Sequence, residues 1–486
     1  MDIISTENLL KVLTAFNPWW QTDAVRKELN KGYKRFAFHE ASRLLNSEDF
    51  RRTVILTGAR RVGKTTIQYQ LIDQLLKAGV APARILFVSL DHPLLKLFTL
   101  NEILDCYQES IYAGKDCYYF FDEVQYMTDW DLWVKTIYDT CPLSRTVATG
   151  SASPVLAKKA TESGVGRWSV IRVPTLSFFE YCELLDIADR PVFSEDVRPT
   201  ALLGYSKQKL RLLLGKLSML QPHFNRYLLV GGFPEIALAK DNFMAQTIMG
   251  EDVVDKVLKR DIPSLYKIRN STELERIFLY VCYHSSSIIA IETISKELEG
   301  VSRATVEDYI GYMESANLLY RSFPIDMGGK KVLKARTKMY IADAAIRNAV
   351  LMDDNLMRDA EQLGITVETA VYKHVAAFYY QNTTKVGYYR GGKKNNEIDV
   401  VVEFPSGKIL IEVKYREKAS IDENDAIFHL ADEANGAIVV TKRAEDFGVQ
   451  PSSGTKKILR LPAFAFLYLL GNAEKNGYRG GRGNLR

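Results

Sequence analysis

The stretch Gly58-Ala-Arg-Arg-Val-Gly-Lys-Thr65 decides the fold, because it fits the P-loop pattern GxxxxGK[ST] at every fixed position. It follows the apolar run 53–56 and opens a helical pattern at Thr66, which is the context that this motif requires. Its glycines let the backbone bend around phosphates, and its backbone N–H groups can point inward at them. The stretch predicts an ATP site formed by Gly58, Ala59, Arg60, Arg61, Val62, Gly63, Lys64, Thr65 and Thr66.

Two acidic residues close a second apolar run, Cys117-Tyr-Tyr-Phe-Phe-Asp-Glu123. Asp122, at the end of this strand, is placed to hold Mg²⁺ together with the Thr65 hydroxyl, directly or through water. Glu123 is then the candidate to polarise the attacking water, while Lys64 neutralises the β- and γ-phosphates. Hydrolysis of ATP needs a metal, a fixed phosphate and a positioned water, so the two motifs together predict hydrolysis of MgATP.

Apolar runs between residues 53 and 190 alternate with helix-length segments, which indicates βαβ units and a parallel sheet. The predicted fold class is α/β: a P-loop parallel sheet with helices on both faces, followed by a helical linker, a winged helix and a restriction-endonuclease-like α/β domain. The predicted domains are 1–190 for the P-loop ATPase, 191–270 for a helical lid or linker, 271–345 for the winged helix, 346–475 for the nuclease-like domain and 476–486 for a flexible Gly/Arg tail.

The composition is that of an ordinary globular protein, with 47% hydrophobic and 25% charged residues over 486 positions. At about 150 residues per domain, this length predicts roughly two to four domains. The net charge of +5 is mildly basic, so it allows a nucleic-acid partner without proving one. Five cysteines without metal-ligand spacing, the lack of a signal peptide and the lack of an apolar run of about 18 residues predict a cytoplasmic protein with no membrane partner.

A helix-turn-helix pattern lies inside the predicted winged helix. A short amphipathic helix over 291–298 is followed by a turn at Gly300, and Ser302 caps a second helix. Such a domain would present the second helix and a basic wing to DNA. Glu307 and Asp308 on that helix would repel phosphate, and winged helices also bind proteins, so a protein partner stays open. The residues predicted to contact DNA are Arg303, Thr305, Lys330 and Lys331.

Two apolar runs near the C-terminal end carry acidic residues. Asp399 lies on the first run, and Glu412 and Lys414 lie two residues apart on the second, so alternation puts these two on one face. An Asp beside Glu-x-Lys resembles the active site of PD-(D/E)xK nucleases, in which two carboxylates hold Mg²⁺ and the lysine steadies or activates the attacking water. Glu368, on the preceding helix, is placed like the extra metal-binding glutamate of that superfamily. The alternative is a degenerate domain that binds DNA without cutting it.

Nearly the whole chain resembles the prokaryotic AAA+ ATPases of the AAA_14/DUF4143 architecture, which are archaeal-type ATPases with a winged helix and a nuclease-like C-terminal domain. The stretches that carry the resemblance include the P-loop, Asn17-Pro-Trp-Trp20, Phe121-Asp-Glu-Val-Gln125, Thr149-Gly-Ser151, Gly231-Gly-Phe-Pro234, Glu397-Ile-Asp399 and Ile411-Glu-Val-Lys414. The tandem Trp19-Trp20 could stack on the adenine or, as is commoner for tryptophan, pack in the core.

The resemblance implies a homo-oligomer, for which a hexamer is one option. In such an assembly Arg167 would act on the γ-phosphate bound by a neighbouring subunit, unless it is a surface salt-bridge residue. Arg145 and Arg172 are the rival candidates for this role. Ser151, or Thr149, would sense the γ-phosphate at the end of the third strand, Arg145-Thr-Val-Ala-Thr-Gly-Ser151. A simple turn is the alternative interpretation.

These features predict a AAA+ ATPase that binds and hydrolyses MgATP and couples it to action on DNA, as a motor or a remodelling enzyme. Cleavage of DNA by the nuclease-like domain stays open. One alternative function is an ATP-gated switch in signalling or defence that hydrolyses ATP slowly. A second alternative is a protein-remodelling or scaffold module whose winged helix contacts proteins.

Overall fold

The structure is a computed structural model that describes residues 5–150, 166–268, 270–326, 336–352, 356–379, 384–391 and 397–476. The chain divides into two compact units. Unit 1 is Met1–Pro174 with Ser315–Asn317, and unit 2 is Thr175–Glu314 with Leu318–Arg486. Within the described ranges, no helix is both long enough and apolar enough to cross a membrane.

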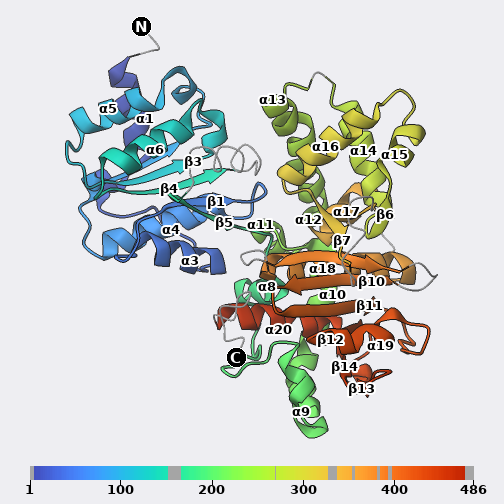
Figure 1. The fold of residues 1–486 in the computed structure, drawn as a ribbon. Coiled ribbons are helices and arrows are strands. Elements are labelled where there is room, and N and C mark those ends of the chain that lie inside the picture. The colour runs from blue at the N-terminus through green and yellow to red at the C-terminus, as the bar shows by residue number, and fades with distance from the viewer. Residues whose placement is uncertain are drawn as a thin grey trace. The chain divides into compact units, whose positions relative to one another are not determined.

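Unit 1, as far as the structure describes it, is built on a five-stranded parallel sheet in the order β2-β3-β4-β1-β5 (Figure 1). Its strands are β1 Thr53–Thr57, β2 Ile85–Ser89, β3 Tyr118–Asp122, β4 Arg145–Gly150 and β5 Trp168–Arg172. The three central strands are buried along almost their whole length, because helices cover both faces of the sheet. The predicted parallel sheet is confirmed, and its strands all end at one edge.

Helices pack on the two faces of this sheet, with α1, α5 and α6 on one face and α3 and α4 on the other (Figure 1). Their bounds are α1 Thr6–Phe16, α2 Trp19–Thr22, α3 Phe36–Leu45, α4 Lys64–Lys77, α5 Leu100–Ser110 and α6 Trp130–Thr140. On the α1 side, Leu13, Ile103 and Trp130 of the helices pack with Phe121 of β3 in one apolar core. This core holds β3 rigidly, so the acidic end of the strand has a fixed position.

Unit 2 begins with a helical stretch. Its helices up to residue 266 are α8 Phe178–Leu184, α9 Lys207–Leu217, α10 Gln221–Val230, α11 Pro234–Ala237, α12 Asn242–Ile248 and α13 Ile262–Tyr266. Between α12 and α13 the chain makes π-helical turns over Met249–Asp255 and Val257–Asp261. The helices that follow are α14 Thr272–Tyr283, α15 Ile291–Glu297, α16 Arg303–Ser315, α17 Ala344–Leu351, α18 Ala360–Tyr379, α19 Ala426–Leu430 and α20 Ala463–Lys475.

A mixed nine-stranded sheet, counted over the described residues, runs through unit 2 in the order β13-β14-β12-β11-β10-β9-β7-β8-β6. Its strands are β6 Ser287–Ile289, β7 Leu319–Pro324, β8 Thr337–Ile341, β9 Lys385–Arg390, β10 Glu397–Phe404, β11 Gly407–Lys414, β12 Gly436–Thr441, β13 Gly448–Pro451 and β14 Lys457–Pro462. Helices α18 and α20 pack against its strands.

The sheet continues across residue 345, where the sequence suggested a boundary between two domains. Strand β7 pairs in parallel with β9, and Phe323 lies opposite Gly387 in the register. A Cβ at Gly387 would lie only 2.1 Å from the carbonyl oxygen of Phe323, so this close pairing needs glycine. The strands on either side of residue 345 therefore form one sheet.

Candidate functional site

The P-loop joins β1 to α4 at the edge of the sheet where the parallel strands end. Gly63 has φ +95°, a left-handed conformation that favours glycine, directly before α4 begins. Gly58 lies against backbone, since a Cβ there would be 2.2 Å from the carbonyl oxygen of Val173. Arg35, which sequence reasoning missed, donates to the carbonyl oxygen of Val62 at 2.9 Å. Glycine geometry and this buried guanidinium together fix the shape of the loop.

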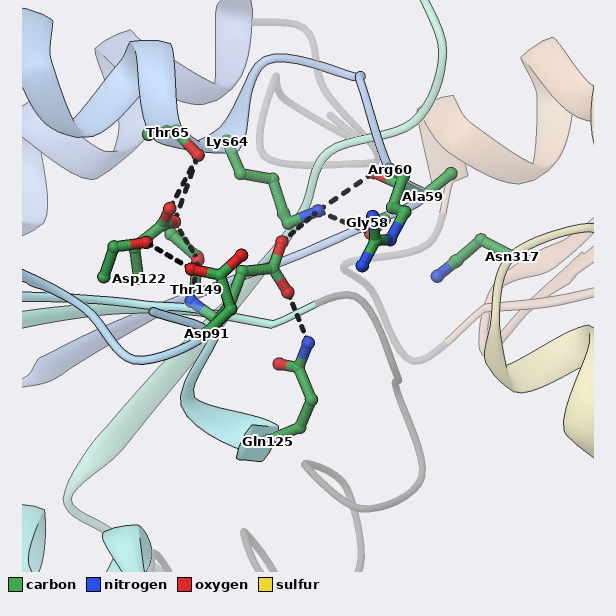
Figure 2. A network of polar contacts seen from close by, with 12 residues as sticks. Gly58, Ala59, Arg60, Lys64, Thr65, Asp91, Asp122, Gln125, Thr149 and Asn317 are labelled. Carbon is green, nitrogen blue, oxygen red and sulfur yellow. Dashed lines mark hydrogen bonds and ion pairs between the residues drawn. The ribbon is translucent and has the colours of Figure 1, made fainter. Parts of the chain in front are cut away.

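The ammonium of Lys64 is folded onto its own loop (Figure 2). It donates to the carbonyl oxygens of Gly58 at 3.0 Å and Ala59 at 2.9 Å. Its side chain is only 3% exposed, and Nζ lies 3.9 Å from a carboxylate oxygen of Glu123. An ammonium can exchange such carbonyl contacts for phosphate oxygens, so Lys64 is positioned as a phosphate ligand.

Three polar side chains meet next to Lys64, from α4, β3 and β4 (Figure 2). The hydroxyl of Thr65 donates to the two carboxylate oxygens of Asp122 at 3.1 and 2.9 Å. The hydroxyl of Thr149 donates to Asp122 at 2.5 Å and accepts from the backbone N–H of Glu123 at 3.0 Å. A hydroxyl and a carboxylate in contact, beside a phosphate-binding loop, are the oxygen ligands that Mg²⁺ prefers.

Burial controls the charge of Asp122. Burial, and then the neighbouring charge of Glu123, raise the pKa of Asp122 to about 6, against an ordinary value of 3.8. The two threonine hydroxyls and Lys64 oppose this rise, because each favours the ionised carboxylate. A negative charge confined in this way is stabilised by a bound cation.

Glu123 follows β3 in a left-handed conformation with φ +55°. The side-chain amide of Gln125 donates to its carboxylate, and Lys64 lies on the other carboxylate oxygen (Figure 2). Sequence reasoning assigned no role to Gln125, although the residue lies within the quoted stretch Phe121–Gln125, two positions after the glutamate. The carboxylate that is the candidate to polarise water is therefore held by two neighbours.

Three stretches of the chain match known families. Residues 50–182, which contain the site just described, match the AAA domain AAA_14. Residues 221–357 match a domain of unknown function, DUF8612, and residues 363–464 match another, DUF4143. The chain thus carries an AAA_14 match and a DUF4143 match in one sequence, which is the architecture that the resemblance predicted. The resemblance seen in the sequence is thereby confirmed.

Relatives of this chain include uncharacterised proteins. One from Methanocaldococcus jannaschii is 26% identical over 370 residues, which cover 74% of this chain and 74% of the relative. One from Haemophilus influenzae is 21% identical over 399 residues, covering 80% of this chain and 89% of the relative. Similar solved structures include the Walker-type ATPase of Pyrococcus abyssi, with 13% identity, a TM-score of 0.40 and coverage of 68% of this chain and 98% of that one. Another is the ORC2 protein of Aeropyrum pernix in its ADP form, with 12% identity, a TM-score of 0.31 and coverage of 67% and 98%.

The tandem tryptophans of the AAA domain pack in the core. The indole N–H groups of Trp19 and Trp20 both donate to the carbonyl oxygen of Ile85, at 3.1 and 2.9 Å. Trp19 is completely buried, and Trp20 stacks on Tyr107. Ile85 begins β2, at the opposite edge of the sheet from the P-loop. The suggested stacking on adenine is therefore wrong for this conformation, and core packing explains both residues.

The arginine candidates lie at different edges of the AAA sheet. Arg167 precedes β5 and pairs with Asp139 at 3.0 Å, with its side chain 34% exposed. Arg145 begins β4, at the same edge, whereas Arg172 ends β5 near the P-loop. Ser151 lies outside the described residues, and Thr149 is the residue that contacts Asp122 and the backbone of Glu123.

The residues predicted to bind DNA lie within the DUF8612 match. Arg303, at the start of α16, is exposed and pairs with Glu292 at 2.9 Å. The backbone N–H of Thr305 donates to the hydroxyl of Ser302, the predicted cap, at 3.1 Å. Lys330 and Lys331 lie outside the described residues. Arg303 is therefore the exposed cation of this predicted set in the part of the chain that the structure describes.

The predicted nuclease residues lie in the DUF4143 domain, and the structure brings most of them together. Asp399 and Glu368 both contact the ammonium of Lys338, a residue that sequence reasoning did not single out. Burial raises the pKa of Glu412 well above its ordinary value, and the nearby charge of Asp399 raises it further. Lys414 instead pairs with Asp425. The acids therefore form a cluster, and the predicted catalytic lysine is engaged elsewhere.

Proposed function

We propose that this protein binds and hydrolyses MgATP at the P-loop and couples that reaction to action on DNA. The observation that carries the ATPase proposal is the meeting of Thr65, Asp122 and Thr149 beside the ammonium of Lys64. This set of donors fits MgATP, because a buried ammonium faces the phosphate loop and a buried carboxylate faces a hydroxyl. Mg²⁺ bound by Thr65 and Asp122 would neutralise charge on the β- and γ-phosphate oxygens.

Side chains of the P-loop and of the strand ends would bind the phosphates and orient the attacking water. Lys64 would leave the carbonyl oxygens of Gly58 and Ala59 and donate to phosphate oxygens. Glu123 would orient the attacking water and accept its proton, once Gln125 releases the carboxylate. The hydroxyl of Thr149 bonds both to the carboxylate of Asp122 and to the backbone N–H of Glu123. It would therefore fix the position of the metal ligand relative to the residue that orients water.

The DNA proposal is supported by the order of elements over residues 272–341. Helix α14 is followed by β6, α15, α16, β7 and β8, and β8 pairs with both β6 and β7 in antiparallel fashion. This is the order of a winged helix, in which α16 would be the recognition helix. Arg303 would exchange its contact with Glu292 for a DNA phosphate. Lys330 and Lys331, in the predicted wing, would contact other phosphates of the DNA.

Assembly into a homo-oligomer completes the proposal. Arg167 would then leave Asp139 and act on the γ-phosphate of a neighbouring subunit, and Ser151 or Thr149 would sense the γ-phosphate. Sedimentation with and without ATP tests the assembly. A monomer under both conditions contradicts it.

The decisive experiment measures ATP turnover with and without single-stranded, duplex and branched DNA, using Lys64→Ala as the inactive control. Stimulation of turnover by DNA, lost in Lys64→Ala, is the expected result. A gel-shift assay over a salt titration tests the contact itself, since phosphate contacts weaken as salt rises. A chain that binds no DNA and shows no stimulation favours the scaffold module instead.

A second candidate is an ATP-gated switch with slow hydrolysis. It is favoured by one observation, which is that Lys64 and Gln125 both engage the carboxylate of Glu123. A switch would bind ATP tightly, turn it over slowly in single-turnover experiments and show no DNA stimulation.

A further inference from the structure

The ammonium of Lys338 lies at the centre of a group of carboxylates that we name the acid cluster, formed by Glu368, Glu397 and Asp399. Its Nζ atom lies 2.8 Å from Glu368, 2.9 Å from Glu397 and 2.9 Å from Asp399. The Lys338 side chain is 3% exposed, so these contacts replace water almost completely. An ammonium has three N–H donors, and each finds a carboxylate here.

Other elements of unit 2 hold the acid cluster in place. The second oxygen of Asp399 accepts the backbone N–H of Val413 on β11 at 2.8 Å. The hydroxyl of Tyr340 donates to Glu368 at 2.9 Å, and its ring stacks on Tyr372 at 4.0 Å between centroids. Strands β8, β10 and β11 and helix α18 thus converge on one cation, and that cation belongs to the chain itself.

A divalent metal ion does not fit this arrangement. Mg²⁺ needs oxygen ligands at about 2.0–2.1 Å in octahedral geometry, and the oxygens of Glu368 and Asp399 that it would use are turned toward Lys338. The positive charges of an ammonium and a metal ion held by the same carboxylates would also repel each other. Over the ranges that the structure describes, no group of three or more His, Cys, Asp and Glu side chains is arranged to hold a metal ion.

A second observation points the same way and is independent of the first. Nuclease chemistry of this type needs a lysine beside the attacking water. The predicted lysine, Lys414, is buried and its ammonium pairs with Asp425. Both the metal position and the lysine position are thus altered.

We propose that the ammonium of Lys338 takes the place of the metal ion, so that the DUF4143 domain keeps a nuclease-like arrangement but does not cut DNA. The same ammonium ties β8 to α18 and β10, and so joins the proposed wing strand to the DUF4143 domain. Removing the ammonium should then let Glu368, Asp399 and Glu412 move together around a divalent cation. The Oε2 atom of Glu412 has no hydrogen-bond partner, so it is available as a further ligand. This proposal does not depend on ATP turnover or on DNA binding.

The experiment measures Mn²⁺ binding to the nucleotide-free full-length chain by electron paramagnetic resonance. All proteins carry Asp122→Asn, which removes the metal ligand of the AAA domain. With no other change, no Mn²⁺ should bind at the acid cluster. Lys338→Met should gain one bound Mn²⁺ per chain, and adding Asp399→Asn should abolish it. Lys385→Met is the matched control, because Lys385 lies on β9 with its side chain 80% exposed, and it should gain nothing.

Three results would overturn the proposal. The first is a folded Lys338→Met protein that gains no Mn²⁺. The second is binding of Mn²⁺ by the chain with Lys338 intact at a site that Asp399→Asn removes, a comparison that holds even if Lys338→Met fails to fold. The third is cleavage of linear or branched DNA by the wild-type chain with Mn²⁺ that Asp399→Asn abolishes.

Discussion

Replacing Asp122 with Asn should have two opposite effects: the nucleotide-free AAA domain becomes more stable, while MgATP hydrolysis is lost. Asp122 is 5% exposed, and burial together with the charge of Glu123 raises the pKa of Asp122 to about 6. Asn carries no charge and keeps one oxygen that can accept from the hydroxyl of Thr65 or Thr149. The substitution therefore removes the cost of the buried charge and also removes a metal ligand.

The size of the stabilisation follows from the pKa. A native pKa of about 6 against 3.8 in the unfolded chain corresponds to about 3 kcal/mol. The native carboxyl holds its proton more tightly than the unfolded one, so the stability of the wild type falls as the pH rises from about 4 through about 6. Above that range the full cost is present. Asp122→Asn should therefore add about 3 kcal/mol at pH 8, roughly half of that at pH 5, and close to nothing below about pH 3.

Tryptophan fluorescence during urea unfolding measures this effect selectively. All five tryptophans, Trp19, Trp20, Trp130, Trp133 and Trp168, belong to unit 1, so their signal reports on the AAA domain. Asp105→Asn, an exposed position on α5, is the matched control and should change little at either pH.

Two results would refute the reasoning. Destabilisation by Asp122→Asn at pH 8 would mean that the carboxylate contributes favourable contacts that outweigh the buried charge. An equal stabilisation at pH 5 and pH 8 would mean that the gain does not come from ionisation. Loss of ATP turnover is expected in either case, and a variant that still hydrolyses MgATP at the wild-type rate removes Asp122 from the metal site.

Further predictions concern other residues of the two sites. Glu123→Gln should keep ATP affinity but lower steady-state turnover roughly 100-fold, since a positioned base contributes about that much; unchanged turnover would remove Glu123 from the mechanism. Gln125→Ala should raise basal turnover about fivefold, which corresponds to ~1 kcal/mol of lost restraint on Glu123; an unaltered rate contradicts the restraint. Gly58→Ala should weaken binding of a fluorescent ATP analogue, because the new Cβ would meet the carbonyl oxygen of Val173 at 2.2 Å; wild-type affinity would mean that the loop moves freely. Lys338→Met should lower the free energy of unfolding of unit 2, followed by circular dichroism, by about 3–5 kcal/mol, because carboxylates are left buried without their partner; a loss under ~1 kcal/mol would show that the acid cluster is solvated.

The nucleotide site could be predicted in large part, because its groups are coded by short contiguous motifs. The P-loop and the strand ending in Asp122 and Glu123 each place their chemistry at the carboxyl end of a strand, and parallel strands share that edge. The roles of Gln125 and Arg35 could not be predicted from such motifs. Their contacts with Glu123 and Val62 depend on how a turn and a distant helix close over the loop.

The DUF4143 domain shows the limit of sequence patterns more sharply. Alternation put Glu412 and Lys414 on one face of β11, and the resemblance to PD-(D/E)xK sites set Asp399 beside them. In the structure the charge of Asp399 does act on Glu412. Alternation could not show that Lys338, 61 residues before Asp399, supplies the cation. That contact depends on the pairing of β7 with β9. This pairing places β8, which carries Lys338, in the same sheet as the strands that carry the acids.

The amino-acid sequence by itself therefore determined which side chains stand at each site: a phosphate-loop lysine and a pair of acids in the AAA domain, and carboxylates in the DUF4143 domain. The tertiary structure alone decided which neighbours those groups have, namely that Trp19 packs under the sheet, that Lys414 turns to Asp425 and that Lys338 fills the acid cluster. The physical reason is that side-chain type and strand period are local properties. The partner of a buried charge is instead set by sheet order and register, which bring together residues far apart in the chain.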